Sequence, residues 1–551
     1  MYALTHRHIL PLARLSVLGT WLWVGCSVAD AQTASTNPPE NGTAAGAAAA
    51  DAERVIVTGS HIPTAAEVGP NPVQDLDRDY IDKAPERTAE QLLRDLPAAS
   101  ANGVPLSNNG TGFAPGASSV SLRGFDASAT LVLIDGRRVA PYPVGTGAIG
   151  TQTFIDLNSI PLAAVASFEI LKDGASTTYG ADAVAGVVNI KLRHDYKGAE
   201  SRIEFGDTLD KDNSEFSSSL VFGIGDGDTD VSGVLNYYQR NAIFNRDRGF
   251  SNYTQKLAKS SASNPGQFQI TRDAALAAGV PASELPNGTS FFGRPPSGTN
   301  GVAAPGDYLY YSTLQQLYNF NEFSSSFPET ERYGGFASFD RKLCGDQLIM
   351  YGDFFYQRAR TEYELAQSPA SFQRPGIISI GIPPQAPGPT LGGPTYESTN
   401  LPIGSFNPFN PFQQIIAGTS RYRLVDFPDR ILDDTTQAYM TTVGLKGDKL
   451  FDGSWGYDAG FRYSEISDRA TGNLVSRSRF GRILNAADPI FDPTSNQFIG
   501  TTVPYNPFCD YHRPIASNAA TIDFATVHPN DLQLSKLTTL DLNVYTTSLF
   551  K

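Results

Sequence analysis

The sequence predicts an α+β domain followed by antiparallel strands of a transmembrane β-barrel that is incomplete in this chain. The first observation is residues 119–193, where short apolar runs alternate with turn signals and helix-like stretches. The second is a change in the residue pattern after Lys197, where apolar and polar residues alternate strictly. The third is the spacing of the connections between the alternating segments, which are in turn short and very long.

The α+β domain is predicted from short local signals. Residues 71–79 are expected to form a first strand and its connection. Thr88 is a plausible N-cap of a short amphipathic helix, with Gln91 three residues on, as in a capping box. The apolar run at 131–134 predicts a strand that is buried on both faces. The remaining predicted elements are a helix-like turn and two strands, at 162–165, 168–171 and 184–192.

Eight strands are predicted after the α+β domain. Between Trp455 and Ser464, aromatic or small apolar residues alternate with glycine and polar residues. This period of two is typical of barrel strands with one face in lipid and one in the lumen, although a soluble β-sandwich alternates in the same way. The predicted strands lie at 199–206, 215–224, 230–240, 331–341, 347–359, 434–446, 454–466 and 537–550.

The connections between these strands distinguish a barrel from a sandwich. Three are short, at 225–228, 342–346 and 447–453. Three are very long and rich in Pro, Gly, Ser and Asn, at 241–330, 360–433 and 467–536. Tight turns on one side and long loops on the other are the outer-membrane pattern, whereas structureless loops of this length are rare in compact soluble domains. The connections therefore favour a barrel.

Composition excludes several other classes of protein. A chain of 551 residues is long enough for two or more domains, and its net charge of −14 argues against a nucleic-acid partner. No run of about 18 to 20 apolar residues follows the N-terminus, so a helical membrane span is not expected. Cys344 and Cys509 form no disulfide framework, no cysteine or histidine spacing suggests a metal site, and no cofactor is expected. We predict that the two cysteines are not bonded, because one falls in a short turn and the other in a long loop.

The N-terminus, residues 1–31, is predicted to be a secretory signal peptide. A basic lead precedes the apolar core Leu15–Val28, and Ala29-Asp30-Ala31 is a cleavage site that would leave Gln32 first. The apolar core is too short for a transmembrane anchor. Lipid attachment at Cys26 is the weaker alternative, because the usual aliphatic residue three positions before the cysteine is missing. Residues 32–69 are rich in small and polar residues and are predicted to form a flexible tether.

Six short motifs follow one another in residues 119–193. They are Arg-Gly-Phe at 123–125, Leu-Ile-Asp-Gly-Arg-Arg at 133–138, Ile-Pro at 160–161, Lys-Asp-Gly-Ala-Ser at 172–176, Tyr-Gly-Ala-Asp-Ala at 179–183 and Gly-Val-Val-Asn-Ile at 186–190. The residues of these motifs and the order in which they occur resemble the plug domain of TonB-dependent outer-membrane receptors. The resemblance implies a plug domain at 70–195, an N-terminal part of a barrel at 199–551, and a location in the outer membrane of a Gram-negative cell.

A short β-branched run, Val55-Ile56-Val57-Thr58, ends the predicted tether. Such a run could add as a strand to the sheet edge of a partner protein, or it could be the first strand of the α+β domain. In the family that this chain resembles, the same place holds the TonB box, which binds the periplasmic protein TonB. The resemblance therefore favours Val55, Ile56, Val57 and Thr58 as the TonB-binding residues.

Aromatic residues in the predicted loops are candidate ligand contacts. The candidates are Phe113 and Tyr142 in loops of the α+β domain, and Phe409 and Phe412 in the loop segment 405–412. The Asn-Pro-Phe motif of this segment recurs in Tyr505–Phe508. Aromatic faces can stack on sugar rings or on aromatic siderophores. The alternative is that these phenylalanines pack the loop on itself or on the barrel rim.

The leading hypothesis is an importer that takes up a siderophore, cobalamin or an oligosaccharide, with TonB and outer-membrane lipid as its other partners. The resemblance implies no chemistry on the ligand, so no catalytic residues are expected. Because such receptors use about 22 strands around the plug, eight strands predict the N-terminal part of a receptor, as a fragment or as a truncated product. A non-transporting remnant or adhesin is therefore the runner-up.

A secreted β-rich hydrolase is the third hypothesis, and it would need paired carboxylates on facing strands. Asp433-Asp434 and the pair Asp173 and Asp182 are available for that role. The first pair falls at a predicted loop end and the second in predicted turns. All four are therefore predicted to be solvated surface residues.

Overall fold

The computed structural model describes residues 73–546, except 100–102, 104–113, 115, 146–152, 210–212, 253–258, 372–379, 452–453, 489, 493–496, 500–503 and 512–518. All of the described residues belong to one compact unit, Arg54–Lys551. The predicted signal peptide, tether and TonB box lie outside the described residues. None of the helices in the described ranges is both long and apolar enough to cross a membrane.

The α+β domain is built on a four-stranded sheet with the order β1-β3-β4-β2, in which only β2 and β4 run parallel. Its strands are β1 (Val73–Leu76), β2 (Thr130–Ile134), β3 (Val165–Leu171) and β4 (Gly186–Leu192). Its helices are α1 (Arg78–Lys83), α2 (Ala89–Arg94) and α3 (Ser176–Tyr179), with short 3₁₀ turns at Ala127–Ala129, Leu157–Ser159, Leu162–Ala164 and Ala181–Ala183.

Local signals predicted most of these elements. Strand β2 is buried along its whole length, as its apolar run predicted. Thr88 caps α2 by accepting a hydrogen bond from the Gln91 amide at 3.3 Å, but the Gln91 side chain accepts from the Arg87 amide rather than from that of Thr88. Helix α1 was missed, because the connection after β1 was expected to be irregular. Asp77 starts this helix by accepting from the Tyr80 amide at 2.8 Å.

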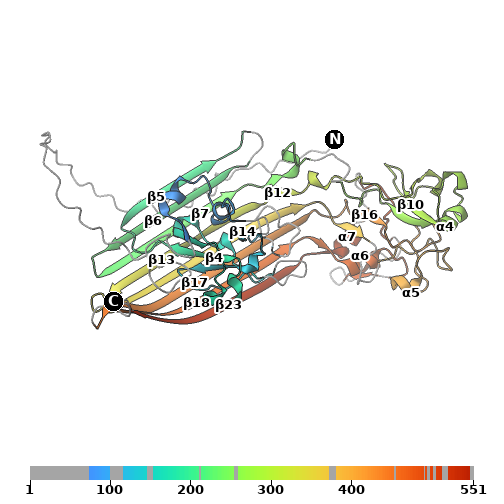
Figure 1. Ribbon diagram of the computed structural model, residues 1–551. Helices are drawn as coiled ribbons and strands as arrows, with labels where there is room; N and C mark the ends of the chain where they lie inside the picture. The colour runs from blue at the N-terminus through green and yellow to red at the C-terminus, as the bar shows by residue number, and fades with distance from the viewer. Residues whose placement is uncertain are drawn as a thin grey trace. The chain divides into compact units, whose positions relative to one another are not determined.

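All eight predicted strands are present and form one antiparallel sheet, which we call the large sheet (Figure 1). Its order is β23-β18-β17-β14-β13-β7-β6-β5, with β5 and β23 at the edges. Several strands are longer than the predictions, because regular pairing continues beyond the alternating residues. Their bounds are β5 (Gly198–Gly206), β6 (Glu215–Gly225), β7 (Thr229–Arg240), β13 (Glu329–Lys342), β14 (Ile349–Leu365), β17 (Arg430–Leu450), β18 (Trp455–Gly472) and β23 (Asn530–Thr546).

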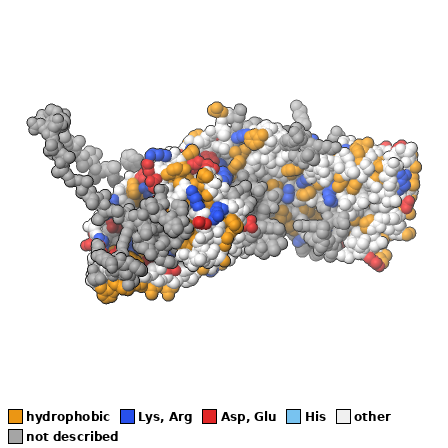
Figure 2. All heavy atoms as spheres, in the orientation of Figure 1, with side chains coloured by type: hydrophobic (Ala, Val, Ile, Leu, Met, Phe, Trp, Pro, Cys, Tyr) orange, Lys and Arg blue, Asp and Glu red, His pale blue; other side chains and the backbone are white. Residues whose placement is uncertain are grey.

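The large sheet carries polar side chains on the face that meets the α+β domain and apolar side chains on the other. On β18, Phe461 is 41% exposed whereas its neighbour Arg462 is 1% exposed. Phe354 on β14 and Val443 on β17 are exposed in the same way. Figure 2 shows hydrophobic side chains at the surface of the region formed by this sheet. Apolar-outside and polar-inside alternation is typical of strands that face lipid.

The three long connections contain short elements with a common core, whereas the sequence predicted only loops there. In Figure 1, β10, α4, α5 and α6 lie together beyond one end of the long strands. The core is largely aromatic and includes Phe268, Phe412, Tyr422, Tyr505 and Phe508. The strands are β8 (Ile243–Phe244), β9 (Phe268–Thr271), β10 (Ser290–Arg294), β11 (Leu309–Tyr311), β12 (Ser325–Phe327), β15 (Pro369–Ser371), β16 (Arg421–Arg423), β19 (Leu474–Val475), β20 (Ile490–Asp492), β21 (Gln497–Ile499) and β22 (Thr526–Val527). The helices are α4 (Arg272–Ala277), α5 (Tyr396–Thr399), α6 (Arg477–Ile483) and α7 (Ala519–Ala525).

A second, mostly aliphatic core joins the α+β domain to the large sheet. Its residues in the domain include Leu92, Val132 and Phe168, and it continues onto Val234 and Phe355 of the sheet. The α+β domain is therefore packed against the sheet by burial of apolar surface as well as by the polar contacts described next.

Candidate functional site

The turn after β2 presents the segment Asp135–Arg138 to the large sheet. Asp135 and Gly136 both have positive φ, at 49° and 72°, which glycine and aspartate tolerate best. The Gly136 amide donates to the Asn189 side chain at 2.7 Å, and Asp135 accepts from the Leu192 amide at 3.0 Å. Bonds to β4 therefore hold this turn in place, and we call residues 135–138 the motif turn.

Arg137 joins the motif turn to three strands of the large sheet. Its Nη2 donates to the Tyr351 hydroxyl on β14 at 2.7 Å and to Asp458 Oδ2 on β18 at 2.8 Å. Its Nε lies 3.3 Å from Asp541 Oδ2 on β23. Tyr351 in turn donates to Asp458 Oδ1 at 2.6 Å. One guanidinium thus forms the centre of a network that spans the domain boundary.

Main-chain groups of the same region are also bound by side chains of the sheet. Arg462 Nη1 donates to the Ile134 carbonyl at 2.6 Å, and its Nε donates to Thr442 Oγ1 at 2.9 Å. The Ala140 amide donates to Ser464 Oγ at 2.8 Å. Because these bonds end on backbone atoms, they fix the position of the turn whatever side chains it carries.

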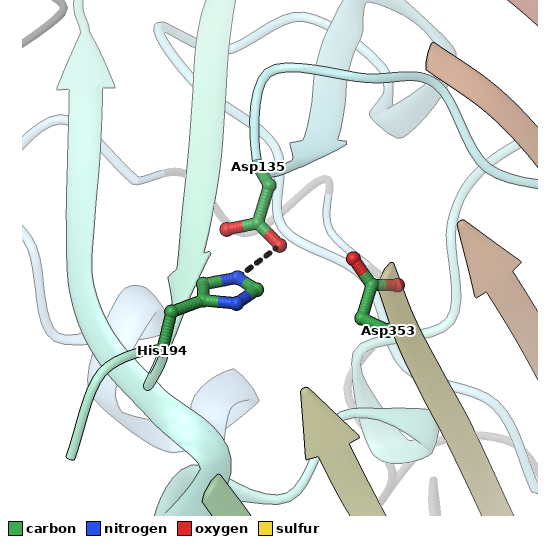
Figure 3. Close-up of side chains that lie close together, drawn as sticks. All are labelled: Asp135, His194 and Asp353. Atoms are coloured by element: carbon green, nitrogen blue, oxygen red, sulfur yellow. Dashed lines mark hydrogen bonds and ion pairs between the residues drawn. The ribbon is translucent and has the colours of Figure 1, made fainter. Parts of the chain in front are cut away.

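Asp135, His194 and Asp353 point toward one another across the boundary between the α+β domain and β14 (Figure 3). His194 Nε2 lies 3.2 Å from Asp135 Oδ2. Burial disfavours the imidazolium, but the Asp135 carboxylate outweighs it and raises the pKa of His194 to about 9. Burial also opposes ionisation of Asp135, yet His194 and Arg462 hold the pKa of Asp135 below its usual value. The pair is therefore ionised at neutral pH.

These three side chains offer ligand atoms within 4.8 Å of one another, the spacing of a metal site. One feature argues against a metal there. The buried guanidinium of Arg462 already interacts with both Asp135 and Asp353, and its positive charge would repel a cation. Two carboxylates are thus balanced by an imidazolium and a guanidinium, and we interpret the group as a charge-balanced contact between the domain and the sheet.

Tyr142, a predicted ligand contact, is buried at the same boundary. Its ring lies 5.4 Å from that of Phe154, and its hydroxyl lies 3.4 Å from Asp434 Oδ2 on β17. The prediction that Asp434 is a solvated surface residue was wrong. Strand β17 begins at Arg430, before the predicted start, so Asp434 lies within the strand and faces the α+β domain.

The other three carboxylates of the hydrolase hypothesis are ion-paired. Asp433 pairs with Arg360, which donates through Nε at 2.8 Å. Asp173 and Asp182 are exposed, as predicted, and pair with Arg123 at 3.1 Å and Arg138 at 2.6 Å.

The loop aromatics pack inside the loop core. Phe412 is fully buried with its ring 5.6 Å from that of Tyr308, and Phe409 is partly buried against the same core. This is the arrangement that the packing alternative predicted. Phe113 and the residues Val55–Thr58 lie outside the described residues.

Three Asn-Pro-Phe motifs explain why these phenylalanines point inward. The side-chain oxygens of Asn407, Asn410 and Asn506 each accept from the amide of the phenylalanine two residues on, at 3.0 Å. Their side-chain nitrogens donate to carbonyls of other loop segments, those of Leu484, Pro383 and Gly301 among them. Each motif is an Asx turn whose asparagine links two segments while its phenylalanine enters the core.

Sequence analysis missed the partners of the motif turn. Arg137 was noted only as part of a motif, and His194 and Arg462 were not singled out. Arg462 did carry a signal, because a charged residue at a lumen-facing position of an alternating strand needs a buried partner. The identity of that partner could not be read from the strand.

Comparisons with known proteins identify the α+β domain. Residues 66–187 match the family model of the TonB-dependent Receptor Plug Domain. Among solved structures, the chain is similar to the siderophore receptor PiuA from Acinetobacter baumannii, with 14% identity, a TM-score of 0.37, and coverage of 89% of this chain and 57% of that one. It is also similar to BauA, the ferric preacinetobactin receptor from Acinetobacter baumannii, with 13% identity, a TM-score of 0.37, and coverage of 86% and 55%. For Fiu, the ferric-catecholate import receptor from E. coli K12, the values are 10% identity, a TM-score of 0.35, and coverage of 87% and 57%.

This chain spans little more than half the length of those three proteins, since it covers 55% to 57% of them. The family model, however, matches five of the six motifs, the first two residues of the sixth, and the motif turn that is bound to the large sheet. The chain therefore carries a TonB-dependent receptor plug domain at residues 66–187, followed by an eight-stranded antiparallel sheet.

Proposed function

We propose that this protein is a TonB-dependent receptor of the outer membrane that takes up a scarce ligand, either a siderophore, cobalamin or an oligosaccharide. The observation that carries the proposal is a plug domain seated on the polar face of a sheet whose other face is apolar. The signal peptide predicted for residues 1–31 would direct export, and lipid would contact the apolar face. The receptor would move its ligand unchanged, so no residue is proposed as catalytic.

Energy for uptake would come from TonB, bound at Val55, Ile56, Val57 and Thr58. These residues precede β1, so a pull on them would act on the plug at its first strand. The contacts between the plug and the large sheet include polar side-chain contacts, such as those of Arg137 and Arg462. Water can replace these polar contacts when the plug moves. A plug held in this way can shift without unfolding the large sheet, whose strands pair with one another.

Proline substitution in the box tests energy coupling. Pro at Ile56 or Val57 removes a backbone donor and should prevent strand pairing with TonB, whereas Ile56→Val keeps the backbone extended and should be nearly silent. In cells, the proline variants should lose ligand uptake but keep ligand binding at the surface. If uptake survives both proline substitutions, Val55–Thr58 is not the box. If uptake is undetectable in the unmodified protein while binding persists, the protein is a surface receptor rather than a transporter.

The ligand would be identified by growth. A strain that lacks the gene should fail on one defined iron or carbon source and recover when the gene is restored. Because Phe412 packs inside the loop core and Tyr142 is buried between the α+β domain and the large sheet, we propose ligand contacts at the partly buried Phe409, with Phe113 as a further candidate. Phe409→Ala should weaken surface binding, with Phe250→Ala, a change at an exposed loop residue, as its control.

A further inference from the structure

A cavity of about 90 Å³ lies between the plug and the large sheet, away from the motif turn. Its plug side includes Arg78, Arg87 and the Leu162 turn, and its sheet side includes Asn236 on β7, Arg332 on β13 and Gln357 on β14, together with residues of β5 and β6. A buried water needs about 10–15 Å³ of such space. The cavity is therefore large enough for a compact solute together with water.

Arg332 is the exceptional residue of this cavity. It is 6% exposed, and its guanidinium takes part in none of the hydrogen bonds or ion pairs of the described residues. Its one described contact is with the ring of Tyr238, whose centroid lies 5.3 Å from the guanidinium carbon. An arginine cannot lose its proton, so a buried guanidinium without a counter-charge is costly.

The other four arginines that line the cavity have carboxylate partners. Arg78, Arg87, Arg193 and Arg202 lie 2.6 to 2.9 Å from Asp82, Glu204, Glu200 and Glu204 respectively. The carboxylates of Glu90 and Asp156 also act on Arg332, but neither forms an ion pair with it. Glu90 pairs with Arg94 at 2.8 Å, and Asp156 accepts from two backbone amides. Arg240, also buried, adds positive charge nearby, with its nearest described carboxylate at 3.9 Å.

The unpaired amide oxygens of Gln357 and Asn236 face the same space. A side-chain amide can present either its oxygen or its NH₂ group by rotating about its last bond. Rotation would aim two donors at a group bound to Arg332. Donors on three neighbouring strands would then surround one position, which is the environment that a tetrahedral or carboxylate oxyanion prefers.

We propose that this cavity is a binding site for a compact oxyanion, held by the Arg332 guanidinium and the amides of Gln357 and Asn236. The anion supplies the counter-charge that Arg332 lacks among the residues that the structure describes. Because the cavity lies between the plug and five strands of the sheet, an anion bound there also stabilises the docked plug. The proposal is independent of ligand uptake, since it concerns only the described contact between the two parts.

The test is equilibrium dialysis of radiolabelled inorganic phosphate with the full chain purified in detergent, together with thermal unfolding in phosphate. Phosphate should bind at one site and raise the melting temperature, whereas sodium chloride at equal ionic strength should not. Arg332→Gln should weaken phosphate binding at least tenfold. Arg341→Gln, which changes an exposed arginine on the same strand, should bind phosphate as the unmodified chain does.

Gln357→Glu keeps the proposal testable if Arg332→Gln does not fold. A glutamate there would place a carboxylate one diagonal position from Arg332, since Gly334 pairs with Gln357 and Arg332 with Ala359. This variant should lose phosphate binding and be at least as stable as the unmodified chain in phosphate-free buffer. Undiminished phosphate binding by Gln357→Glu or Arg332→Gln would overturn the proposal, as would an equal effect of chloride.

A third experiment distinguishes a free oxyanion from the acidic group of a larger solute. Phenyl phosphate carries the same charged group on a larger, apolar body. If phosphate binds and phenyl phosphate does not, the site takes a free anion. If both bind and both depend on Arg332, the site takes the acidic group of a larger solute. If neither binds, the cavity is not an anion site.

Discussion

Two regions of this molecule are stabilised by different kinds of interaction. Where the plug meets the large sheet, arginines, carboxylates and a histidine bridge the boundary around an aliphatic core. Beyond the strand ends, the long loops share a core of aromatic rings linked by buried asparagines. The polar contacts at the plug boundary can exchange their partners for water, although separating the plug also exposes its aliphatic core, whereas the loop core is held mainly by aromatic burial.

The difference bears on the function proposed above, in which the plug moves and the loops do not. Polar contacts around an aliphatic core give the plug a defined position, and water can replace the polar part of that contact. Aromatic burial gives the loops a shape that does not depend on the plug. Four substitutions or measurements test this contrast, from the largest expected effect to the smallest.

The largest effect is expected from Tyr505→Ala in the loop core. Tyr505 is fully buried and its ring stacks on that of Tyr511 with centroids 5.6 Å apart. Its hydroxyl donates to Asp426 Oδ1 at 2.8 Å and is hydrogen-bonded to the Tyr422 hydroxyl at 2.6 Å. Loss of a buried aromatic side chain should cost about 3–5 kcal/mol. Hydrogen exchange should quicken in the loops and stay unchanged in β2 and β4. Phe250→Ala removes an aromatic residue that is 84% exposed and should do neither.

A smaller effect is expected from Arg137→Gln at the plug boundary. The variant loses charged hydrogen bonds to Tyr351 and Asp458 and the ion pair with Asp541, which should cost about 1–3 kcal/mol of plug docking. Urea should make the plug protease-sensitive at a lower concentration, while the loops keep their resistance.

Its neighbour supplies the matched control. Arg138 pairs with Asp182 inside the plug, and both side chains are largely exposed, so Arg138→Gln should cost about 0–1 kcal/mol. Equal effects of the two substitutions would mean that the Arg137 network does not hold the plug.

The third effect depends on pH. The pKa of His194 is about 9 in the folded protein and about 6.5 in an unfolded chain, so the stabilisation by its charge is complete below 6.5 and is lost as pH rises through 9. Plug docking should therefore weaken between pH 7 and pH 9.5. His194→Gln should remove this dependence, because the glutamine side chain carries no proton that titrates. A dependence that persists in the variant would assign it to another group.

The smallest effect concerns the two cysteines, which are both free. Cys344 is exposed in the turn between β13 and β14, whereas Cys509 is buried in the loop core, where burial raises the pKa of its thiol. A maleimide should label Cys344 at once and Cys509 only after the loops open, with no change in stability. Peptide mapping without reducing agent should find no bridge between them. A bridge would place the turn and the loop at the same end of the sheet.

The sequence by itself determined the strands and their sidedness. The alternation from Trp455 to Ser464 placed Phe461 on the exposed face and Arg462 on the buried one, because successive side chains in a strand point to opposite faces. The order of short and long connections likewise marked the two ends of the sheet. The motifs at 123–190 identified the plug, since they are local and follow one another in the chain.

Only the tertiary structure decided which residues meet across the faces. Arg137 and Asp458 are 321 residues apart, and the sequence around either residue does not identify the other as its partner. Asp434 became buried because β17 starts early and the plug covers it. The loop phenylalanines turned inward because Asn407, Asn410 and Asn506 bind carbonyls of distant segments. A repeat along one chain segment fixes which side chains share a face, whereas the partner of that face depends on how the whole chain packs.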